Sequence, residues 1–499
     1  MNELKNFAIG GSDGILVEQL CKMSNRHGLI TGATGTGKTV TLQVLAESFS
    51  RLGIPVFATD IKGDLSGLGA AGSPHPKIDE RLQKIPLESF HQRPYPVVFW
   101  DIYGENGHPI RSTISEMGPL LLSNLLDLND TQSGILYGCF KIADDQGLLL
   151  LDLKDLRAML VWMNHNAKAL RGEYGNISSA SIGAIQRRLL VLEEQGAEHF
   201  FGEPAVQLAD LMKVDLSGNG IINIFDATKL MIQSPRVYSS FLLWLLSELF
   251  EQLPEVGNPD KPKLVLFFDE AHLLFDQAPK VLIDKIEQVV RLIRSKGVGI
   301  YFITQTPLDV PEEILGQMGL KIQHALRAFT PKDRKVIKNV AESFPPNSAF
   351  DTETMITALG TGEALVSVLD EKGRPQAVQK TLIRPPESKI GALTKKERQA
   401  KIERSPLKGR YDEGVDRNSA YEILKKRAEV MQEEEDAFEK QAEVEKNNRK
   451  TQHKTIPKKR RSSRQGTVET LIKSAARAIG SRLGRKIVRG IMGSLFGGR

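Results

Sequence analysis

The chain is poor in cysteine, with only Cys21 and Cys139 among its 499 residues. Two cysteines exclude a disulfide-stabilised framework and are typical of a reducing compartment. Long hydrophobic runs are also lacking, because the longest, at 148–151 and 241–246, fall far short of the roughly 20 residues that a membrane span requires. The N-terminal residues contain no apolar signal core. These absences favour a cytoplasmic protein.

Charge is divided unevenly along the chain. The whole sequence carries a net charge of +6, but residues 387–499 hold 29 Lys and Arg against 16 Asp and Glu, a net charge of +13. The preceding residues therefore carry a net charge of −7. An affinity for acidic partners is expected of the basic tail rather than of the acidic body.

A glycine-rich segment lies near the N-terminus, between a short apolar strand predicted at 27–31 and a helix predicted at 40–49. Its residues, Gly32-Ala33-Thr34-Gly35-Thr36-Gly37-Lys38-Thr39, match the P-loop pattern, in which backbone N–H groups and a helix N-terminus cradle a phosphate. In this pattern the lysine, Lys38, reaches the β- and γ-phosphates, and the hydroxyl of Thr39 joins the Mg²⁺ shell. The segment predicts a site for ATP and Mg²⁺.

Two adjacent carboxylates follow another apolar strand, predicted at 263–268. With a P-loop upstream, Asp269 is predicted to hold the Mg²⁺ shell and Glu270 to polarise the attacking water. Such a pair distinguishes a P-loop protein that hydrolyses its nucleotide from one that only binds it. The alternative is that both carboxylates cap the helix that follows.

Further polar residues end neighbouring strands. Gln305 follows the strand predicted at 299–304, where an amide can contact the γ-phosphate or the water. Asp60 and Asp64 follow the strand predicted at 55–60, at the sheet edge where ligands collect. These aspartates either position water or a neighbouring subunit, or they belong to an ordinary solvated turn.

An arginine is expected to stabilise the charge that develops during phosphoryl transfer. Arg294 precedes one apolar strand and Arg327 ends another, and either would reach the nucleotide of a neighbour in a ring. Either is also compatible with a surface salt bridge, and we favour Arg327. Three histidines, His27, His272 and His324, lack metal-ligand spacing and are expected to be structural.

The order of the predicted elements indicates an α/β fold with a mainly parallel sheet, because the strands lack the polar alternation of half-exposed strands. Strands are predicted at 27–31, 55–60, 96–101, 220–226, 263–268, 299–304, 321–328 and 363–369. The predicted domains are a first part of the core at 1–111, a helical insertion at 112–215, a second part of the core at 216–386, a charged and largely flexible linker at 387–465, and a basic amphipathic helix at 466–499.

The combination of the P-loop with three further segments resembles the HerA/FtsK superfamily of P-loop ATPases, and in particular its bacterial group of HerA-like ATPases. The three segments are the turn Asp60-Ile61-Lys62-Gly63-Asp64, the acidic strand end at 264–272, and residues 294–307, which end in Phe302-Ile303-Thr304-Gln305-Thr306-Pro307. The resemblance covers residues 5–385. It implies a RecA-like core, hexameric rings, ATP hydrolysis between subunits and pumping of DNA.

One feature departs from the archaeal HerA proteins, which carry an N-terminal β-barrel that docks a partner nuclease. Only residues 1–27 precede the P-loop strand here, so we do not expect the barrel. A nuclease partner and a role in DNA end resection are therefore not inferred.

Two classes of function are compatible with these residues. The first is a ring-shaped translocase or helicase that contacts the phosphates of DNA, most simply double-stranded DNA, without reading its bases. The second is an ATPase switch or motor that acts on a protein or membrane partner, since type IV secretion ATPases share the core. The helix predicted at 466–499 is compatible with subunit packing, nucleic acid or anionic lipid.

Overall fold

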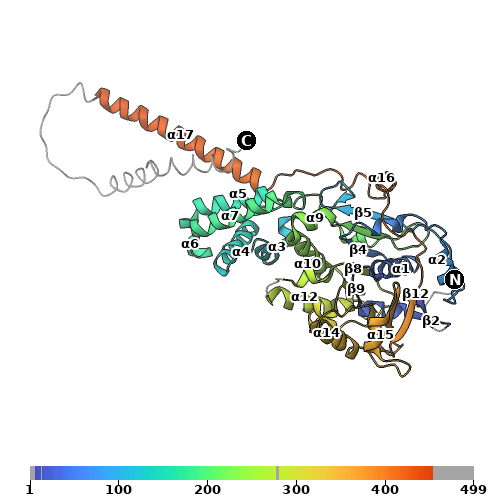
Figure 1. Ribbon diagram of the computed structural model, residues 1–499. Helices are drawn as coiled ribbons and strands as arrows, with labels where there is room; N and C mark the ends of the chain where they lie inside the picture. Colours follow the sequence, from blue (N-terminus) through green and yellow to red (C-terminus); the bar gives the residue numbers. More distant parts are fainter. Residues whose placement is uncertain (1–5, 13, 277–279, 453–499) are drawn as a thin grey trace. The chain divides into compact units, whose positions relative to one another are not determined.

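The computed structural model describes residues 6–12, 14–276 and 280–452 (Figure 1). Its contacts divide the chain into two compact units, each assembled from segments that are distant in sequence. Of the described residues, the first unit, called the α/β unit, comprises those within 6–112 and 204–414, and the second, called the helical unit, comprises 113–203 and 415–452. Residues 204–215 thus belong to the α/β unit, although the sequence pattern assigned them to the helical insertion.

The α/β unit is built on a mixed sheet of twelve strands in the order β2-β1-β12-β11-β10-β3-β9-β8-β4-β7-β5-β6. The strands from β10 to β6 in this order are parallel, and β11, β12, β1 and β2 extend the sheet in antiparallel pairs. The strands are β1 (Asn6–Ser12), β2 (Ile15–Leu20), β3 (Gly28–Thr31), β4 (Val56–Asp60), β5 (Val97–Asp101), β6 (His108–Pro109), β7 (Ile222–Asp226), β8 (Leu264–Phe268), β9 (Val298–Thr304), β10 (Leu320–His324), β11 (Glu363–Ser367) and β12 (Gln379–Ile383).

The predicted α/β class with a mainly parallel sheet is confirmed, and every predicted strand is present. The P-loop strand β3 and the acidic strand β8 are separated by the single strand β9, as in a RecA-like core. The largest difference in length is at β10, which ends at His324, so that residues 325–328 leave the sheet. Two other strands, β7 and β11, are each two residues shorter than predicted. The hairpin of β1 and β2 and the strands β6 and β12 were not predicted.

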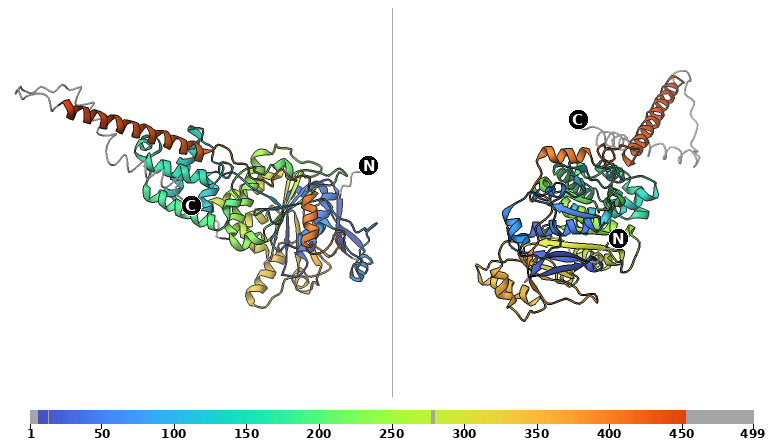
Figure 2. Two further views of the ribbon diagram at one scale, coloured as in Figure 1. Left: turned by 90° about the horizontal axis from the view of Figure 1, so that it is seen from above. Right: turned by 90° about the vertical axis from the view of Figure 1, so that its right-hand side faces the viewer.

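Helices cover both faces of the sheet, with α1 (Lys38–Arg51) on one side and α10 (Pro235–Gln252) and α12 (Lys280–Ile293) on the other (Figures 1 and 2). Alternate residues of a strand point to opposite faces. In β4, Val56 and Ala58 pack in the cluster that contains Leu45 and Phe49 of α1. On the other face, the ring of Phe57 lies 6.2 Å from that of Phe241 of α10. Burial of both faces explains why the strands read as uninterrupted apolar runs.

Shorter helices complete the α/β unit. They are α2 (Pro76–Leu82), α8 (Leu208–Leu211), α9 (Thr228–Gln233), α11 (His272–Phe275), α13 (Glu312–Leu315), α14 (Pro331–Glu342), α15 (Thr352–Ala358) and α16 (Lys395–Glu403). Among the described helices of the whole chain, none combines the length and the apolar character that a membrane span requires.

The helical unit joins α17 to five consecutive helices. These are α3 (Ile114–Leu125), α4 (Asp130–Asp145), α5 (Leu153–His165), α6 (Ala167–Tyr174) and α7 (Ser179–Glu194), and α17 spans Ala420–Gln452. The start of α17 is fixed on α5, because the buried Asp155 accepts hydrogen bonds from the Ser419 hydroxyl, at 2.5 Å, and the Tyr421 N–H, at 2.9 Å. A single carboxylate of α5 therefore anchors a helix more than 260 residues further along the chain.

Residues 384–414, which we call the strap, differ from the flexible linker predicted from residue 387 onward. The strap packs on the α/β unit, and its residues Glu387, Leu393 and Tyr411 are buried. Arg398 of the strap lies 2.8 Å from the carboxylate of Asp226 at the end of β7. The charged composition suggested disorder, but several of these charges are paired with buried partners. The rest of the predicted linker beyond 452, and the amphipathic helix predicted at 466–499, lie outside the described residues.

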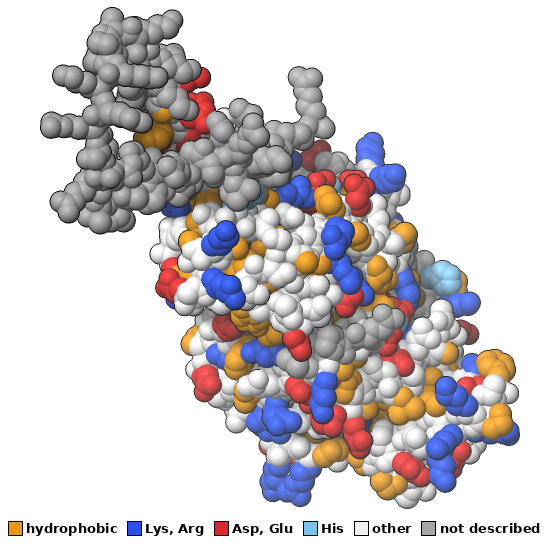
Figure 3. Space-filling model, turned by 90° about the vertical axis from the view of Figure 1, so that its left-hand side faces the viewer, with side chains coloured by type: hydrophobic (Ala, Val, Ile, Leu, Met, Phe, Trp, Pro, Cys, Tyr) orange, Lys and Arg blue, Asp and Glu red, His pale blue; other side chains and the backbone are white. Residues whose placement is uncertain are grey.

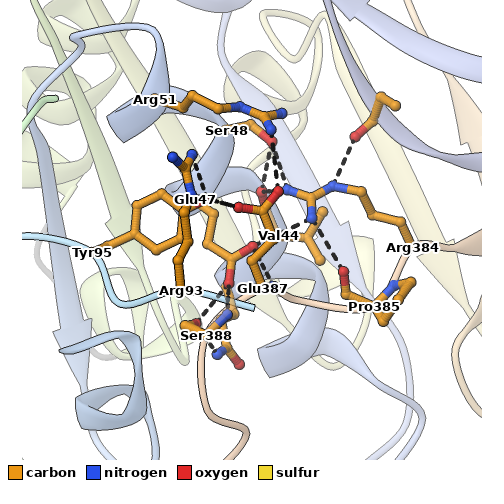
Figure 4. A network of polar contacts seen from close by, with 12 residues as sticks. Val44, Glu47, Ser48, Arg51, Arg93, Tyr95, Arg384, Pro385, Glu387 and Ser388 are labelled. Atoms are coloured by element: carbon orange, nitrogen blue, oxygen red, sulfur yellow. Dashed lines mark hydrogen bonds and ion pairs between the residues drawn. The ribbon is translucent and has the colours of Figure 1, made fainter. Parts of the chain in front are cut away.

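The strap is joined to α1 by a buried polar network (Figure 4). Arg384, only 3% exposed, lies 3.3 Å from the carboxylate of the fully buried Glu47 and also donates to the Val44 carbonyl. The same carboxylate accepts the backbone N–H groups of Glu387 and Ser388. The P-loop helix is thus held from behind by a segment that is about 340 residues away in sequence.

Candidate active site

The P-loop connects β3 to α1 at the carboxyl edge of the parallel strands. Gly32, Gly35 and Gly37 adopt positive φ angles of 151°, 77° and 118°, which non-glycine residues rarely adopt. At Gly32 an added Cβ would also lie only 2.5 Å from the Cβ of His324. Two backbone hydrogen bonds also fix the loop. The N–H of Gly32 donates to the Gln305 carbonyl at 3.2 Å, and the N–H of Ala33 donates to the Ala325 carbonyl at 2.9 Å. Its glycines are therefore required by its shape.

The side chain of Lys38 lies beneath this loop. It is buried, and its Nζ donates to the carbonyl oxygens of Gly32, at 2.5 Å, and Ala33, at 3.2 Å. Burial and the nearby ammonium of Lys62 lower the pKa of Lys38, whereas Glu270 and Asp269 act in the opposite direction. The lysine is thus in electrostatic contact with both carboxylates of the predicted site.

The acidic pair follows β8, which is two strands away from β3. Asp269 is 8% exposed, and its backbone N–H donates to the Thr59 hydroxyl at 2.9 Å. Burial raises the pKa of Asp269 to about 6. Glu270 has a positive φ of 48°, a strained conformation for this residue type. Neither residue caps a helix, so the alternative drawn from the sequence does not describe the structure.

The turn after β4 brings three charged residues to the same edge. Asp60 is 1% exposed, and its carboxylate accepts hydrogen bonds from the backbone N–H groups of Gly63, Asp64 and Leu65 at 2.7–3.2 Å. Burial and the neighbouring Asp64 raise the pKa of Asp60 to about 7. Asp60 therefore shapes the turn from within, and neither the solvated turn nor a water-positioning role describes it. Burial raises the pKa of Asp64, and the Thr39 hydroxyl of the P-loop acts in the opposite direction.

Lys62, at the tip of this turn, is a site residue that the sequence analysis missed. Its Nζ lies 3.0 Å from Oε1 of Glu270. The other oxygen, Oε2, lies 3.6 Å from Nδ1 of His272 and forms no hydrogen bond with a described residue. Burial opposes the charge of Lys62, but Asp269 and Glu270 outweigh it and raise the pKa of the lysine. A lysine between two aspartates after a strand was the available signal, but the sequence does not say which carboxylate it meets.

The remaining predicted residues lie at different edges of the sheet. Gln305 follows β9 at the P-loop edge, and its side chain is exposed. Arg327 lies after β10 at this edge, exposed, with its guanidinium donating to the Thr357 carbonyl at 2.8 Å. Arg294 precedes β9, whose seven residues place it roughly 23 Å away, at the opposite edge. Within one chain, only Arg327 of the two arginines lies beside the P-loop.

Two of the histidines are held neutral inside the α/β unit. Nδ1 of His324 lies 3.0 Å from the Glu363 carbonyl and its Nε2 lies 2.8 Å from the Thr41 hydroxyl, so Nδ1 carries the proton. His27 is placed similarly between the Val290 carbonyl and the Ile300 N–H. Burial lowers the pKa of each histidine to about 4. These contacts agree with the structural role expected of both residues.

The edge fits a magnesium-bound triphosphate by its own chemistry. The P-loop presents backbone N–H groups, and a lysine lies under it. Its glycines Gly32 and Gly37 pack against His324 and Gly362, where a Cβ would be crowded. Facing it are oxygen ligands of the kind that Mg²⁺ prefers, from Thr39 and Asp269. The buried oxygen Oε2 of Glu270, which forms no hydrogen bond with a described residue, leaves one acceptor available for a water molecule.

Comparison with known proteins gives one family and several distant relatives. The family described as "Helicase HerA-like C-terminal" matches residues 8–499. The DNA double-strand break repair helicase HerA of Sulfolobus acidocaldarius is 21% identical over 350 residues, which cover 68% of this chain and 62% of the relative. The chain thus spans less than two thirds of that relative's length.

Solved structures of similar fold are also distant. VirB4 of Thermoanaerobacter pseudethanolicus matches with a TM-score of 0.49 and 18% identity, over 80% of this chain and 99% of that one. The bacterial conjugative coupling protein TrwB matches with a TM-score of 0.47 and 17% identity, over 79% of this chain and 91% of that one.

Proposed function

The chain belongs to the HerA-like helicase C-terminal family, and from this premise we propose that it is an ATPase that moves nucleic acid, with double-stranded DNA as its substrate. The observation that carries the proposal is the convergence at one sheet edge of the P-loop lysine with the buried Asp269 and the half-buried Glu270. A lysine under a glycine loop suits a triphosphate, and the second carboxylate, Glu270, suits its hydrolysis.

In this proposal each residue of the edge has one task. The backbone N–H groups of Gly35 and Gly37 and the ammonium of Lys38 hold the phosphates, and Thr39 and Asp269 hold Mg²⁺. The N–H groups of Gly32, Ala33 and Thr36 instead fix the loop through hydrogen bonds to carbonyls. When bound, MgATP supplies the bond to be broken and the cation that neutralises its charge. Glu270 accepts a proton from the attacking water, and Gln305 contacts that water or the terminal phosphate.

Lys62 acts on the reaction through Glu270. Its ammonium holds one oxygen of this carboxylate, so the other oxygen is left to meet the water. The strained backbone of Glu270 supports a functional rather than a structural role for the residue. We therefore assign Lys62 as a positioning residue of the proposed site.

A ring of identical chains completes the proposal. In a hexamer each nucleotide lies between neighbouring subunits. Arg327 stabilises the charge on the neighbour's nucleotide, and Arg294 is the second candidate for this role. Two relatives are DNA double-strand break repair helicases, which supports DNA as the partner. The alternative of a protein or membrane partner depends on residues 466–499, and no observation on the described residues favours it.

The test is the ATP turnover of the purified full chain with and without duplex DNA, with the native mass measured in the same buffer. We expect duplex DNA to raise the turnover of a multimer. The stimulation should fall steeply with salt, because cations that contact phosphates release counterions. If neither duplex nor single-stranded DNA changes the turnover, the proposed DNA motor is wrong, and anionic vesicles become the next ligand to try.

A further inference from the structure

Helix α14 departs from the mixed charge of the molecular surface. On the face drawn in Figure 3, Lys and Arg side chains are interspersed with Asp and Glu. Between residues 332 and 338, by contrast, α14 carries four cations and a single acid, Asp333. The cations are Lys332, Arg334, Lys335 and Lys338. All four are exposed, and none forms an ion pair with another described residue.

The single acid is occupied by the backbone. The carboxylate of Asp333 accepts hydrogen bonds from the N–H groups of Phe329, at 2.9 Å, and Thr330, at 2.8 Å, and so caps the start of the helix. These hydrogen bonds lower the pKa of Asp333, and they direct its charge to the helix N-terminus. Glu342, the other acid of α14, is its last residue and forms no ion pair with the cations among the described residues, so α14 carries four cations against two acids.

The four cations share one side of the helix. At about 100° per residue they fall within an arc of about 160°, and the inward-facing residues Ile337 and Val340 lie outside that arc. Ile337 and Val340 are buried in a cluster that also contains Leu326 and Phe344. The apolar side of α14 is therefore already covered, which excludes the insertion of an amphipathic helix into a lipid surface. Only the cationic side is free to meet a partner.

An exposed aromatic residue lies just before α14. Phe329, two residues before the helix, is 89% exposed. The segment follows β10, whose neighbour Ala325 is bonded to the P-loop, so it belongs to the same edge of the sheet as the proposed ATP site. Clustered cations beside an aromatic ring are typical of surfaces that track a nucleic-acid backbone.

We propose that the exposed side of α14, together with Phe329, is a docking surface for the sugar–phosphate backbone of DNA. The inference rests on the proposed function, because it names the surface through which the motor would hold its substrate. Charge complementarity indicates a polyanion as the partner. Four cations without ion pairs would contact the phosphates of a DNA backbone and would not distinguish one base from another. Contact with an acidic surface of a second copy is the competing outcome.

The experiment measures binding of a fluorescent DNA duplex to the full chain at several salt concentrations. The test variant replaces the four cations of α14 by Gln, which keeps helix propensity close to that of Lys and Arg. The control variant makes the same change of charge at four exposed lysines elsewhere in the α/β unit. These control residues are Lys77, Lys84, Lys395 and Lys396.

We expect the α14 variant to bind at least about tenfold more weakly near 0.1 M salt, and the slope of log affinity against log salt to fall by about 0.9 for each phosphate that the variant no longer neutralises. The control variant should keep the parental slope, and both variants should keep the parental ATP affinity. A parent that binds duplex DNA with an α14 variant that binds equally well overturns the inference and leaves the proposed function intact. A parent that fails to bind DNA overturns both.

A photoreactive ring at one position identifies the partner directly. Phe329→p-benzoylphenylalanine should crosslink to labelled duplex DNA on illumination, and excess unlabelled duplex should suppress the product. Crosslinking to a second copy of the chain in place of DNA, with loss of the multimer in the α14 variant, would make this face a subunit interface and overturn the inference.

Discussion

Helix α1 takes part in two polar networks that differ in how completely their charges are paired. Behind the helix, the carboxylate of Glu47 accepts three hydrogen bonds from Glu387 and Ser388 and lies beside the guanidinium of Arg384. At the front, Glu270 has one oxygen against Lys62 and the other without a hydrogen bond among the described residues. Both networks are largely buried, but only the front one leaves an acceptor unused.

The difference separates structural from functional polarity. A buried carboxylate with every lone pair satisfied holds segments together, because leaving any partner out would cost the desolvation of a charge. A carboxylate with a buried oxygen that accepts no hydrogen bond and with a strained backbone lowers the stability of the fold. Its presence therefore indicates a role in function rather than in folding. The comparison predicts that changes in the two networks will affect different properties: turnover at the front and stability behind.

The largest effect is expected for Glu270→Gln. The amide is similar in size to the carboxylate but does not accept a proton, so turnover should fall by roughly 10²- to 10⁴-fold. ATP binding, measured by equilibrium titration with a fluorescent analogue, should be retained. Lys38→Ala provides the contrast, because the loss of the phosphate-binding ammonium should weaken nucleotide binding itself. Retained hydrolysis in the Gln variant would show that another group activates the water.

The next largest effect is expected for Arg384→Met, which leaves Glu47 buried without its cation. Removal of one partner of a buried pair costs about 3–5 kcal/mol in the free energy of unfolding. The matched control is Arg51→Met, because Arg51 pairs at 3.1 Å with Glu387 in the same network but is 36% exposed. Loss of such an exposed pair costs about 0–1 kcal/mol.

Urea unfolding of both variants checks this expectation. Equal losses of unfolding free energy in the two arginine variants would show that the buried Arg384–Glu47 pair contributes no more to stability than the exposed Arg51–Glu387 pair. The double variant Glu47→Gln/Arg384→Met should recover part of the loss, because it no longer buries an unpaired charge.

The sheet and the P-loop edge were predictable because their signals are local. Apolar runs covered on both faces, the glycine pattern and the adjacent carboxylates each lie within about ten residues, and all recur in the structure. The strap was not predictable, since Glu47 and Arg384 are 337 residues apart and each looks like an ordinary surface charge in isolation. A chain ended near Arg384 would therefore lose part of its core, and a truncation that tests the basic tail belongs after Gln452.

The sequence predicted the chemical role of individual site residues from their type, but not which of them lie together. The sequence offered both arginines and favoured Arg327, and strand direction separates them in the structure, because Arg294 precedes β9 and Arg327 follows β10. The pairing of Lys62 with Glu270 depends on β4 lying next to β8, which the order of the strands along the chain does not reveal.

That pairing gives the smallest and most discriminating of the predicted effects. Lys62→Met removes the ammonium that holds Glu270 and keeps the length of the side chain, so the carboxylate becomes free to turn away from the water. Misplacement of a reacting group by about 1 Å can cost up to roughly 100-fold, and we expect turnover to fall about 10- to 100-fold. Lys62→Arg, which restores the charge, should recover part of this loss.

The matched control for Lys62→Met is Lys229→Met. Lys229 is equally exposed, at 40%, and its Nζ also forms an ion pair, at 2.5 Å with Glu105, but it lies outside the proposed site. Single-turnover and ATP-binding measurements separate the possibilities. A lower rate of the chemical step with unchanged ATP affinity in the Lys62 variant alone identifies a positioning residue. A loss of ATP affinity would instead make Lys62 a phosphate ligand. Equal behaviour of the two Met variants would show that the pairing of Lys62 with Glu270 does not contribute to turnover. The orientation of the Glu270 carboxylate would then not depend on the turn after β4.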